Sequence, residues 1–302
     1  MQATPIEWGG AVYLAGEFTG RDGAGEWQTN YYGISGAPVV STGGDLLGAC
    51  SKTFGAAAQR VFGITPRAEL DRLLERGRLL GMAPAWPSDV TEPAGVLEAG
   101  ASVIVLDVWG DVVLGTTGHV TLVRDGAFLS LGHPINPSEL GPCLYAAFRA
   151  PVLAIHPDGD HRAALTRLGE AFGAITYTGA AGCYGVRRWP IPSVELRCRL
   201  VSRSGRSLLE RRCFVAADPR RWRASLGRAA PMLFWNCAPD VREGGEVEMS
   251  SPTTSHAFRV EPGSAHDDVR TQAHRNLHEF MRTLEEDVRR VEITIRLDRE
   301  QA

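Results

Sequence analysis

The sequence lacks a strong net charge and a long apolar run. Its 302 residues carry 32 basic and 35 acidic side chains. The net charge of −3 gives no overall basic field to gather the phosphates of a nucleic acid, so we expect no nucleic-acid partner. No stretch reaches the roughly 20 apolar residues of a membrane span, and the first residues lack the basic and apolar parts of a signal peptide. We therefore expect no membrane span and a cytoplasmic location.

Paired cysteines and a complete metal-ligand motif are also missing. The six cysteines lie far apart with no CxxC pair, which argues against a zinc ribbon or a dithiol motif and favours buried, reduced thiols. Cys143 and Cys183 are candidate thiol nucleophiles, but neither has a base nearby in the sequence. His274 and His278 share one face of a predicted helix, with His266 near its start, yet no third ligand is evident. We expect no metal.

Length and composition predict a folded protein of about two domains. As far as about residue 190, short apolar runs alternate with glycine-rich turns, which is typical of β-structure. One helix interrupts this part: we expect Thr65 to be its N-cap, Pro66 its first residue, and Gly81 its end. Residues 82–95 hold three prolines and are the expected linker or crossover.

The last part of the chain mixes both periodicities. After residue 190, "SVELRCRLV" and "SLLERRCFVAA" read as two strands around a turn, and "PRRWRASLGRAAPMLFW" reads as a helix. A second, amphipathic helix of five or six turns is predicted before the closing strand "VEITIRL". Its apolar positions are Val269, Ala273, Leu277, Phe280, Leu284 and Val288. We expect a smaller α+β C-terminal domain over residues 191–302.

The stretch "GISGAP" places Ser35 between glycines. A nucleophilic serine needs a tight turn that projects its hydroxyl, with backbone N–H groups free to hold an oxyanion, and glycine permits both. Gly33 and Ser35 would supply those N–H groups, Gly36 would let the chain turn, and Pro38 would begin the next strand. The alternative is that Ser35 is only a small residue in a hairpin.

A nucleophilic serine also needs a base. His133, in "GAFLSLGHPINP", stands at the end of an apolar run and is the first candidate. His119, in "GTTGHVTLV", is predicted in the middle of a strand and is the second. The alternative for both is a hydrogen-bonded structural histidine.

Three stretches resemble segments of the SpoIVB-type serine peptidases. "NYYGISGAPVVSTGGDLLGACSKTFGAAAQRVFGITPRAEL" is similar to their catalytic-serine segment, in which G-M-S-G-S-P precedes a short hairpin and a helix. "GTTGHVTLVRDGAFLSLGHPINP" resembles their histidine segment, and "LGEAFGAITYTGAAGCYGV" the region that follows it. The resemblance spans about residues 25–186. Ala37 stands where the family motif has serine, and the serine segment comes first here, as though the chain were permuted.

This resemblance implies a mainly β, chymotrypsin-like double barrel over residues 1–190. It implies that Ser35 is the nucleophile, that His133 is the general base, and that the amides of Gly33 and Ser35 form the oxyanion hole. It also implies a serine endopeptidase without a cofactor that acts on a protein or peptide substrate. A triad is defined by geometry rather than chain order, so the altered order is compatible with this chemistry.

The acidic third member of a triad is not evident in the sequence. Asp22 is our candidate, and Asp160, in "HPDGDH", is its rival. The alternative for either aspartate is that it only stabilises a turn of the chain. The glycine-rich stretch 20–25 is a candidate site of self-cleavage. The alternative function, from another class, is an inactive peptidase-fold scaffold that binds a peptide or partner protein, using the C-terminal domain as its interaction surface.

Overall fold

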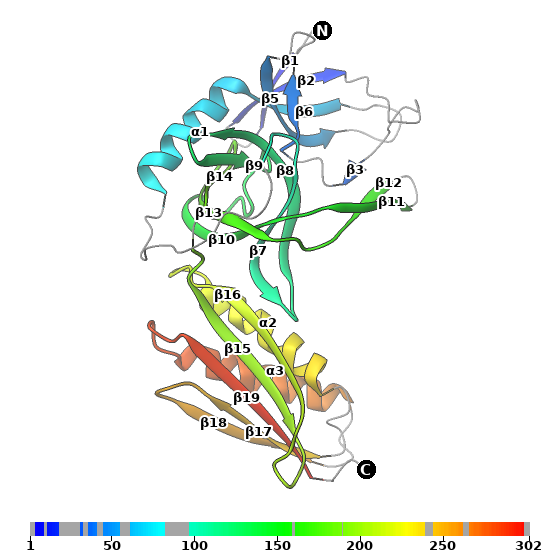
Figure 1. Cartoon of the computed structure of the whole chain (residues 1–302), viewed down its shortest axis with the longest axis vertical. Coiled ribbons are helices and arrows are strands. Elements are labelled where there is room, and N and C mark those ends of the chain that lie inside the picture. Colours follow the sequence, from blue (N-terminus) through cyan, green and yellow to red (C-terminus); the bar gives the residue numbers. More distant parts are fainter. Residues whose placement is uncertain are drawn as a thin grey trace. The chain divides into compact units, whose positions relative to one another are not determined.

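The computed structural model describes most of the chain as two compact units. The described residues are 4–8, 11–17, 31–32, 36–40, 45–54, 61–81, 97–158, 161–188, 190–238, 244–261 and 266–298. The first unit comprises Met1–Val105 and Thr116–Ile191, and the second comprises Leu106–Gly115 and Pro192–Ala302. The described part is mainly β, as the sequence predicts (Figure 1). Residues 106–115 belong with the second unit, although the sequence analysis places them in the first.

Six strands close into a ring, and all but the end of one strand and the start of the next belong to the first unit. They are β7 (Ser102–Gly110), β8 (Leu114–Arg124), β9 (Ala127–Ser130), β10 (Gly141–Arg149), β13 (Ala171–Gly179) and β14 (Gly182–Arg187). Their order is β10-β13-β14-β9-β8-β7, and β10 also pairs with β7. Apolar side chains such as Val103, Val120, Phe128 and Ile175 fill the interior, where the rings of Phe128 and Phe172 lie 5.1 Å apart. Closure removes exposed strand edges and fixes the loop that follows β9.

A second antiparallel sheet of the first unit contains the strand that begins at Pro38, shortly after Ser35. It is formed by β1 (Thr4–Trp8), β2 (Ala11–Glu17), β6 (Val61–Pro66), β5 (Leu46–Phe54) and β4 (Pro38–Val40), in the order β1-β2-β6-β5-β4. A separate small sheet is formed by β11 (Val152–Asp158), β12 (His161–Thr166) and β3 (Tyr31–Tyr32).

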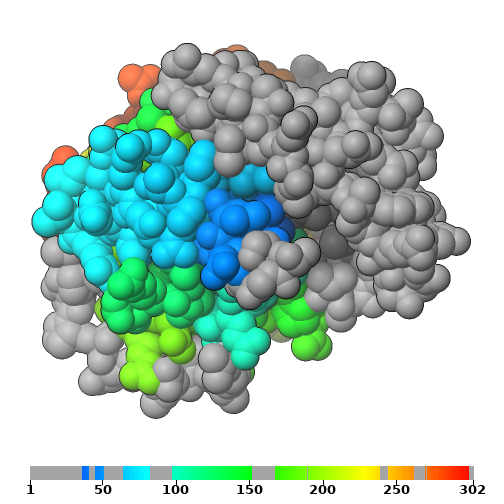
Figure 2. Space-filling view, turned by 90° about the horizontal axis from the view of Figure 1, so that it is seen from above, coloured from blue at the N-terminus to red at the C-terminus, as the bar shows by residue number. Residues whose placement is uncertain are grey.

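Helix α1 (Arg67–Leu80) follows β6 directly and ends before Gly81. It buries Leu70, Leu73 and Leu74, spaced to share one face, and packs against β5, β13 and β14. In Figure 2 α1 (cyan) borders the described residues of β4 and β5 (blue). The predicted N-cap is wrong: Pro66 occupies that position with no side-chain cap, because the Thr65 hydroxyl bonds instead to the carbonyl of Gly132, 3.1 Å away.

The second unit is a sheet with two helices. Its strands are β16 (Ser207–Ala216), β15 (Ser193–Val201), β19 (Arg290–Leu297), β17 (Gly245–Ser250) and β18 (Ser255–Val260), and the end of β7 pairs with β16. The predicted hairpin and closing strand are confirmed as β15–β16 and β19. Figure 1 shows α2 (Trp222–Cys237) and α3 (His266–Thr283) on one face of this sheet.

Alternation along β15 explains the two faces of that sheet. Val194, Leu196 and Cys198 are buried under the helices, whereas Glu195 and Arg197 between them pair on the other face at 3.0 Å. The predicted last helix is confirmed at about five turns, but it ends at Thr283, so Leu284 and Val288, predicted to lie on it, are buried beyond its end. The expected linker 82–95 lies outside the described residues. Among the helices that the structure describes, none has the length and apolar character needed to cross a membrane.

Candidate active site

The structure describes one side of the predicted site. Ser35 and Gly33, the predicted nucleophile and oxyanion donors, lie outside the described residues, as do Asp22, its rival Asp160 and the stretch 20–25. His133, half-buried in the loop after β9, and Gly36, directly after Ser35, are described. The surroundings of these two residues define the candidate site.

Gly36 sits in a turn that admits only glycine. Its φ of +85° lies in the left-handed region, and a Cβ atom there would lie 2.4 Å from both the carbonyl oxygen of His119 and the amide nitrogen of Leu131. Its own N–H donates to the carbonyl of Cys50 at 2.7 Å, and its carbonyl accepts from Thr121 Oγ1 at 2.6 Å. The turn that follows Ser35 is therefore fixed between β5 and β8.

The residues before His133 are held in an unusual backbone conformation. Leu131 and Gly132 both have left-handed φ angles, 69° and 62°, and Leu131 is fully buried. A non-glycine residue in this region is strained, and such strain clusters at functional sites. A Cβ atom on Gly132 would lie 2.3 Å from the carbonyl oxygen of Cys50 and 3.1 Å from the amide nitrogen of Gly36. The chain neighbours of Ser35 and His133 are thus in direct contact.

The His133 ring has a defined partner. Its Nδ1 lies 2.8 Å from the carbonyl oxygen of Pro134. Since a carbonyl oxygen can only accept, Nδ1 carries the proton, and the neutral ring then presents a bare Nε2 as its basic nitrogen. This is the tautomer that a general base requires.

Side chains from two other elements hold this loop. Thr65 on β6 donates to the carbonyl of Gly132, and Cys183 on β14 lies with its Sγ 3.7 Å from the carbonyl oxygen of His133. The sequence analysis missed the parts played by Thr65, Thr121 and Cys183. Their partners lie 67, 85 and 50 positions away, so no local pattern could indicate them.

His119, the second candidate base, has a structural partner. Its Nε2 lies 3.3 Å from Oγ of Ser102 on the neighbouring strand, and its carbonyl accepts the Leu131 N–H at 3.2 Å. Its described contacts are those of a residue that supports the turn.

All six cysteines are buried and none forms a disulfide, as the sequence predicts. Burial raises the pKa of Cys183 to about 12, which outweighs the hydrogen bonds that lower it. The thiolate is the nucleophilic form of cysteine, so the Cys183 thiol is inert at neutral pH. Cys143 is fully buried inside the ring of strands. Neither candidate thiol nucleophile is supported.

The raised pKa of Cys183 predicts a pH-dependent stability. Between pH 9.0, the ordinary pKa of the thiol, and about 12, the unfolded chain ionises while the folded chain holds the proton, so stability falls as pH rises. From pH 8 to pH 10 this thiol should lower the free energy of unfolding by about 1 kcal/mol. Urea unfolding measures the free energy of unfolding at both pH values. Its decrease from pH 8 to pH 10 should be smaller, by that amount, for Cys183→Ala than for wild type.

The matched control is Ile175→Val, which also trims a buried side chain of the ring but removes no ionisable group. It should lose stability equally at both pH values and keep the wild-type slope. If Cys183→Ala and wild type lose the same free energy between pH 8 and 10, the Cys183 thiol ionises in the folded protein.

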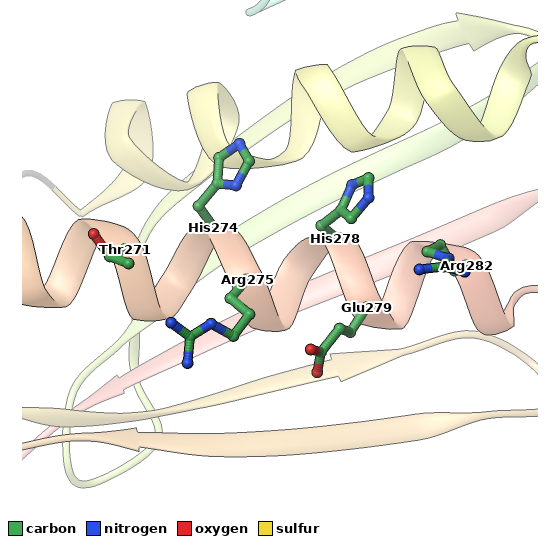
Figure 3. Close-up of a pocket in the computed structure, with 6 residues that line it drawn as sticks. All are labelled: Thr271, His274, Arg275, His278, Glu279 and Arg282. Atoms are coloured by element: carbon green, nitrogen blue, oxygen red, sulfur yellow. The ribbon is translucent and has the colours of Figure 1, made fainter.

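Two histidines of α3 line a separate pocket in the second unit, and the side chain of His266 lies outside the described part of the chain. His274 and His278 point to the same side of the helix, with ring centroids 6.4 Å apart (Figure 3). Arg275 and Arg282 line the same pocket and oppose a bound cation. In the described part of the chain, no three histidine, cysteine, aspartate or glutamate side chains are grouped to hold a metal ion.

Comparison with known proteins gives no independent assignment: no protein-family model matches the chain, and no curated protein matches it.

Proposed function

We propose that the chain is a SpoIVB-type serine peptidase, with Ser35 as nucleophile and His133 as general base. The contact between Gly36 and Gly132 carries this proposal, because these are the chain neighbours of Ser35 and His133. Two segments that resemble the serine and histidine segments of one peptidase family, far apart in sequence, meet at glycines that leave no room for a side chain. A shared catalytic site would account for this meeting.

The proposed chemistry is acyl transfer. His133 Nε2 takes the proton of Ser35 Oγ as that oxygen attacks the carbonyl carbon of the scissile peptide bond. The amides of Gly33 and Ser35 hold the resulting oxyanion, and the protonated His133 then gives its proton to the departing amine as the C–N bond breaks. Water, deprotonated by His133, hydrolyses the acyl-enzyme and frees Ser35. No cofactor takes part.

The proposed fold is a chymotrypsin-like double barrel followed by an α+β domain. The ring of β7, β8, β9, β10, β13 and β14 is one barrel in this proposal, and the sheet containing β4 and β5 belongs to the other. Support comes from the positions of the two segments: the serine segment leads into β4, and His133 follows β9. The α+β domain, residues 191–302, would offer a surface for a protein partner.

Labelling with a fluorophosphonate, which reacts only with an activated serine, tests the proposed function. Wild type should gain one adduct, mapped to Ser35 by peptide mass spectrometry. Ser35→Ala should gain none, and His133→Ala should react about 10³-fold more slowly, because the general base is lost.

Two matched variants serve as controls. Ser102→Ala removes a serine that is hydrogen-bonded to a histidine, and His256→Ala removes a histidine of the second unit that bonds Asn276. Both should label at the wild-type rate. Folded wild type without an adduct would overturn the peptidase proposal and favour the scaffold that binds a peptide or partner protein.

A further inference from the structure

We infer that the backbone carbonyl of Pro134 orients His133, so that the site works as a serine–histidine dyad without a carboxylate third member. The catalytic part of this inference rests on the proposed function. The orientation of the ring does not, since it depends only on His133 and Pro134.

The first observation is the geometry at Nδ1. In a triad the acidic residue accepts a hydrogen bond from Nδ1, which fixes both the tautomer and the direction of Nε2. Here the carbonyl oxygen of Pro134 takes that position at 2.8 Å, an ordinary distance for an N–H···O bond. One acceptor suffices for the single Nδ1 proton, so the tautomer a general base needs is already set.

The second observation is that the accepting carbonyl belongs to a tightly held loop. Proline restricts its own φ, and the two preceding carbonyls, of Gly132 and His133, contact the side chains of Thr65 and Cys183. The chain just beyond is closed by Asn136, whose side chain accepts from the amide and hydroxyl of Ser138 at 3.1 and 2.8 Å. A carbonyl held on both sides orients the ring at little entropic cost.

The third observation concerns the carboxylates. Within the described residues, the polar contact that the structure gives the His133 ring is with the carbonyl of Pro134, and no carboxylate is hydrogen-bonded to it. A carbonyl dipole stabilises an imidazolium less than a carboxylate does, because it carries no net charge. The dyad should therefore be a slower catalyst than a full triad.

Nitrogen NMR of the imidazole rings tests the orientation directly. Protein labelled with ¹⁵N at histidine, at a pH where the ring is neutral, should show His133 with a protonated Nδ1 and a bare Nε2. The His133 signal is assigned by its loss in His133→Gln. The same tautomer should persist in Asp22→Asn, in Asp160→Asn and in the double variant. A protonated Nε2 in wild type, or a change of tautomer in either aspartate variant, would overturn the inference.

Labelling rates test its catalytic consequence. Losing the acid of a true triad costs about 10⁴-fold, whereas Asp22→Asn and Asp160→Asn should label Ser35 within about threefold of wild type. A loss of a hundredfold or more in either variant would assign that aspartate as third member. Because the NMR result does not require a reactive serine, failure of Ser35 to label at all would reject the peptidase proposal while the tautomer still decides the orientation.

A backbone ester supplies the positive test. Replacing Ile135 by its α-hydroxy acid turns the Pro134 carbonyl into an ester carbonyl, a weaker acceptor, and should slow labelling about tenfold. The substitution also removes the Ile135 N–H, which bonds the Cys183 thiol. Cys183→Ala removes that bond together with the Cys183 contact with the His133 carbonyl, but it leaves the amide carbonyl of Pro134 intact and should slow labelling less. Equal rates in the ester and Cys183→Ala proteins would show that the Pro134 carbonyl does not support His133.

Discussion

Gly36→Ala is expected to abolish fluorophosphonate labelling and to lower the free energy of unfolding by about 3 kcal/mol. Two costs add. The left-handed φ of +85° costs an alanine about 1–2 kcal/mol, and the new methyl group would lie 2.4 Å from backbone atoms of His119 and Leu131. These backbone atoms are joined by a hydrogen bond between the Leu131 N–H and the His119 carbonyl and cannot retreat as a flexible side chain can. The turn after Ser35 must therefore move, and its contact with Gly132 is lost.

Gly100→Ala is the matched control. Its φ of +87° is almost the same, but a Cβ atom there meets nothing within 4 Å. It should cost only the conformational part, about 1–2 kcal/mol, and should leave labelling intact. Intact mass after labelling and urea unfolding measure both effects. Equal losses in the two variants would mean that the close approach of Gly36 to β8 and Leu131 does not exist in solution.

Gly77→Ala is expected to destabilise the first unit by about 2 kcal/mol, although alanine favours helices. Removing a glycine from the middle of α1 gains about 1 kcal/mol of helix propensity. The new Cβ, however, would lie 2.1 Å from Cγ of Tyr184, a buried side chain on β14 that has no room to withdraw. Overpacking of this kind costs about 1–3 kcal/mol or more, so it outweighs the propensity.

Gly227→Ala in α2 separates the gain in helix propensity from the cost of overpacking. Its Cβ would approach only Nδ1 of the exposed His278, at 3.4 Å, which is ordinary contact. This variant should be stabilised by up to about 1 kcal/mol. Hydrogen exchange measured on peptides from α1 and from α2 reports the local stability of each helix. It should be faster in α1 of Gly77→Ala and slower in α2 of Gly227→Ala than in wild type. Slower exchange in α1 of Gly77→Ala would contradict the packing of that helix on Tyr184.

Periodicity predicted which residues are buried better than where elements end. The alternation in Ser193–Val201 gave the correct strand because only one face of it is covered. The three-to-four spacing continued through Leu284 and Val288, which are buried, yet the helix ends at Thr283. The spacing indicates which side chains contact the core. Residues beyond the end of the helix can still make that contact. Nothing in the sequence indicated that residues 106–115 would pack into the core of the second unit.

The site was predictable only as far as side-chain types and motifs go. The glycines around Ser35 pointed to a tight turn, and Gly36 has a left-handed φ angle. Thr65 was assigned to a local cap because threonine is typical there, while its actual partner is 67 residues away. The partner of His133 is a main-chain oxygen, which every residue possesses, so composition and spacing hold no sign of it.

The position of residues 106–115 in the second unit matters for any attempt to produce the two units as separate fragments. A fragment beginning at Pro192 would lack Val108 and Val112 from its core and would leave Cys213–Val215 of β16 as a bare strand edge. Bare edges recruit other chains and aggregate. The complementary fragment, residues 1–191, would contain those same apolar residues without the core that covers them. The two units are therefore separate in the structure, but cutting the chain at residue 191 would not yield two intact units.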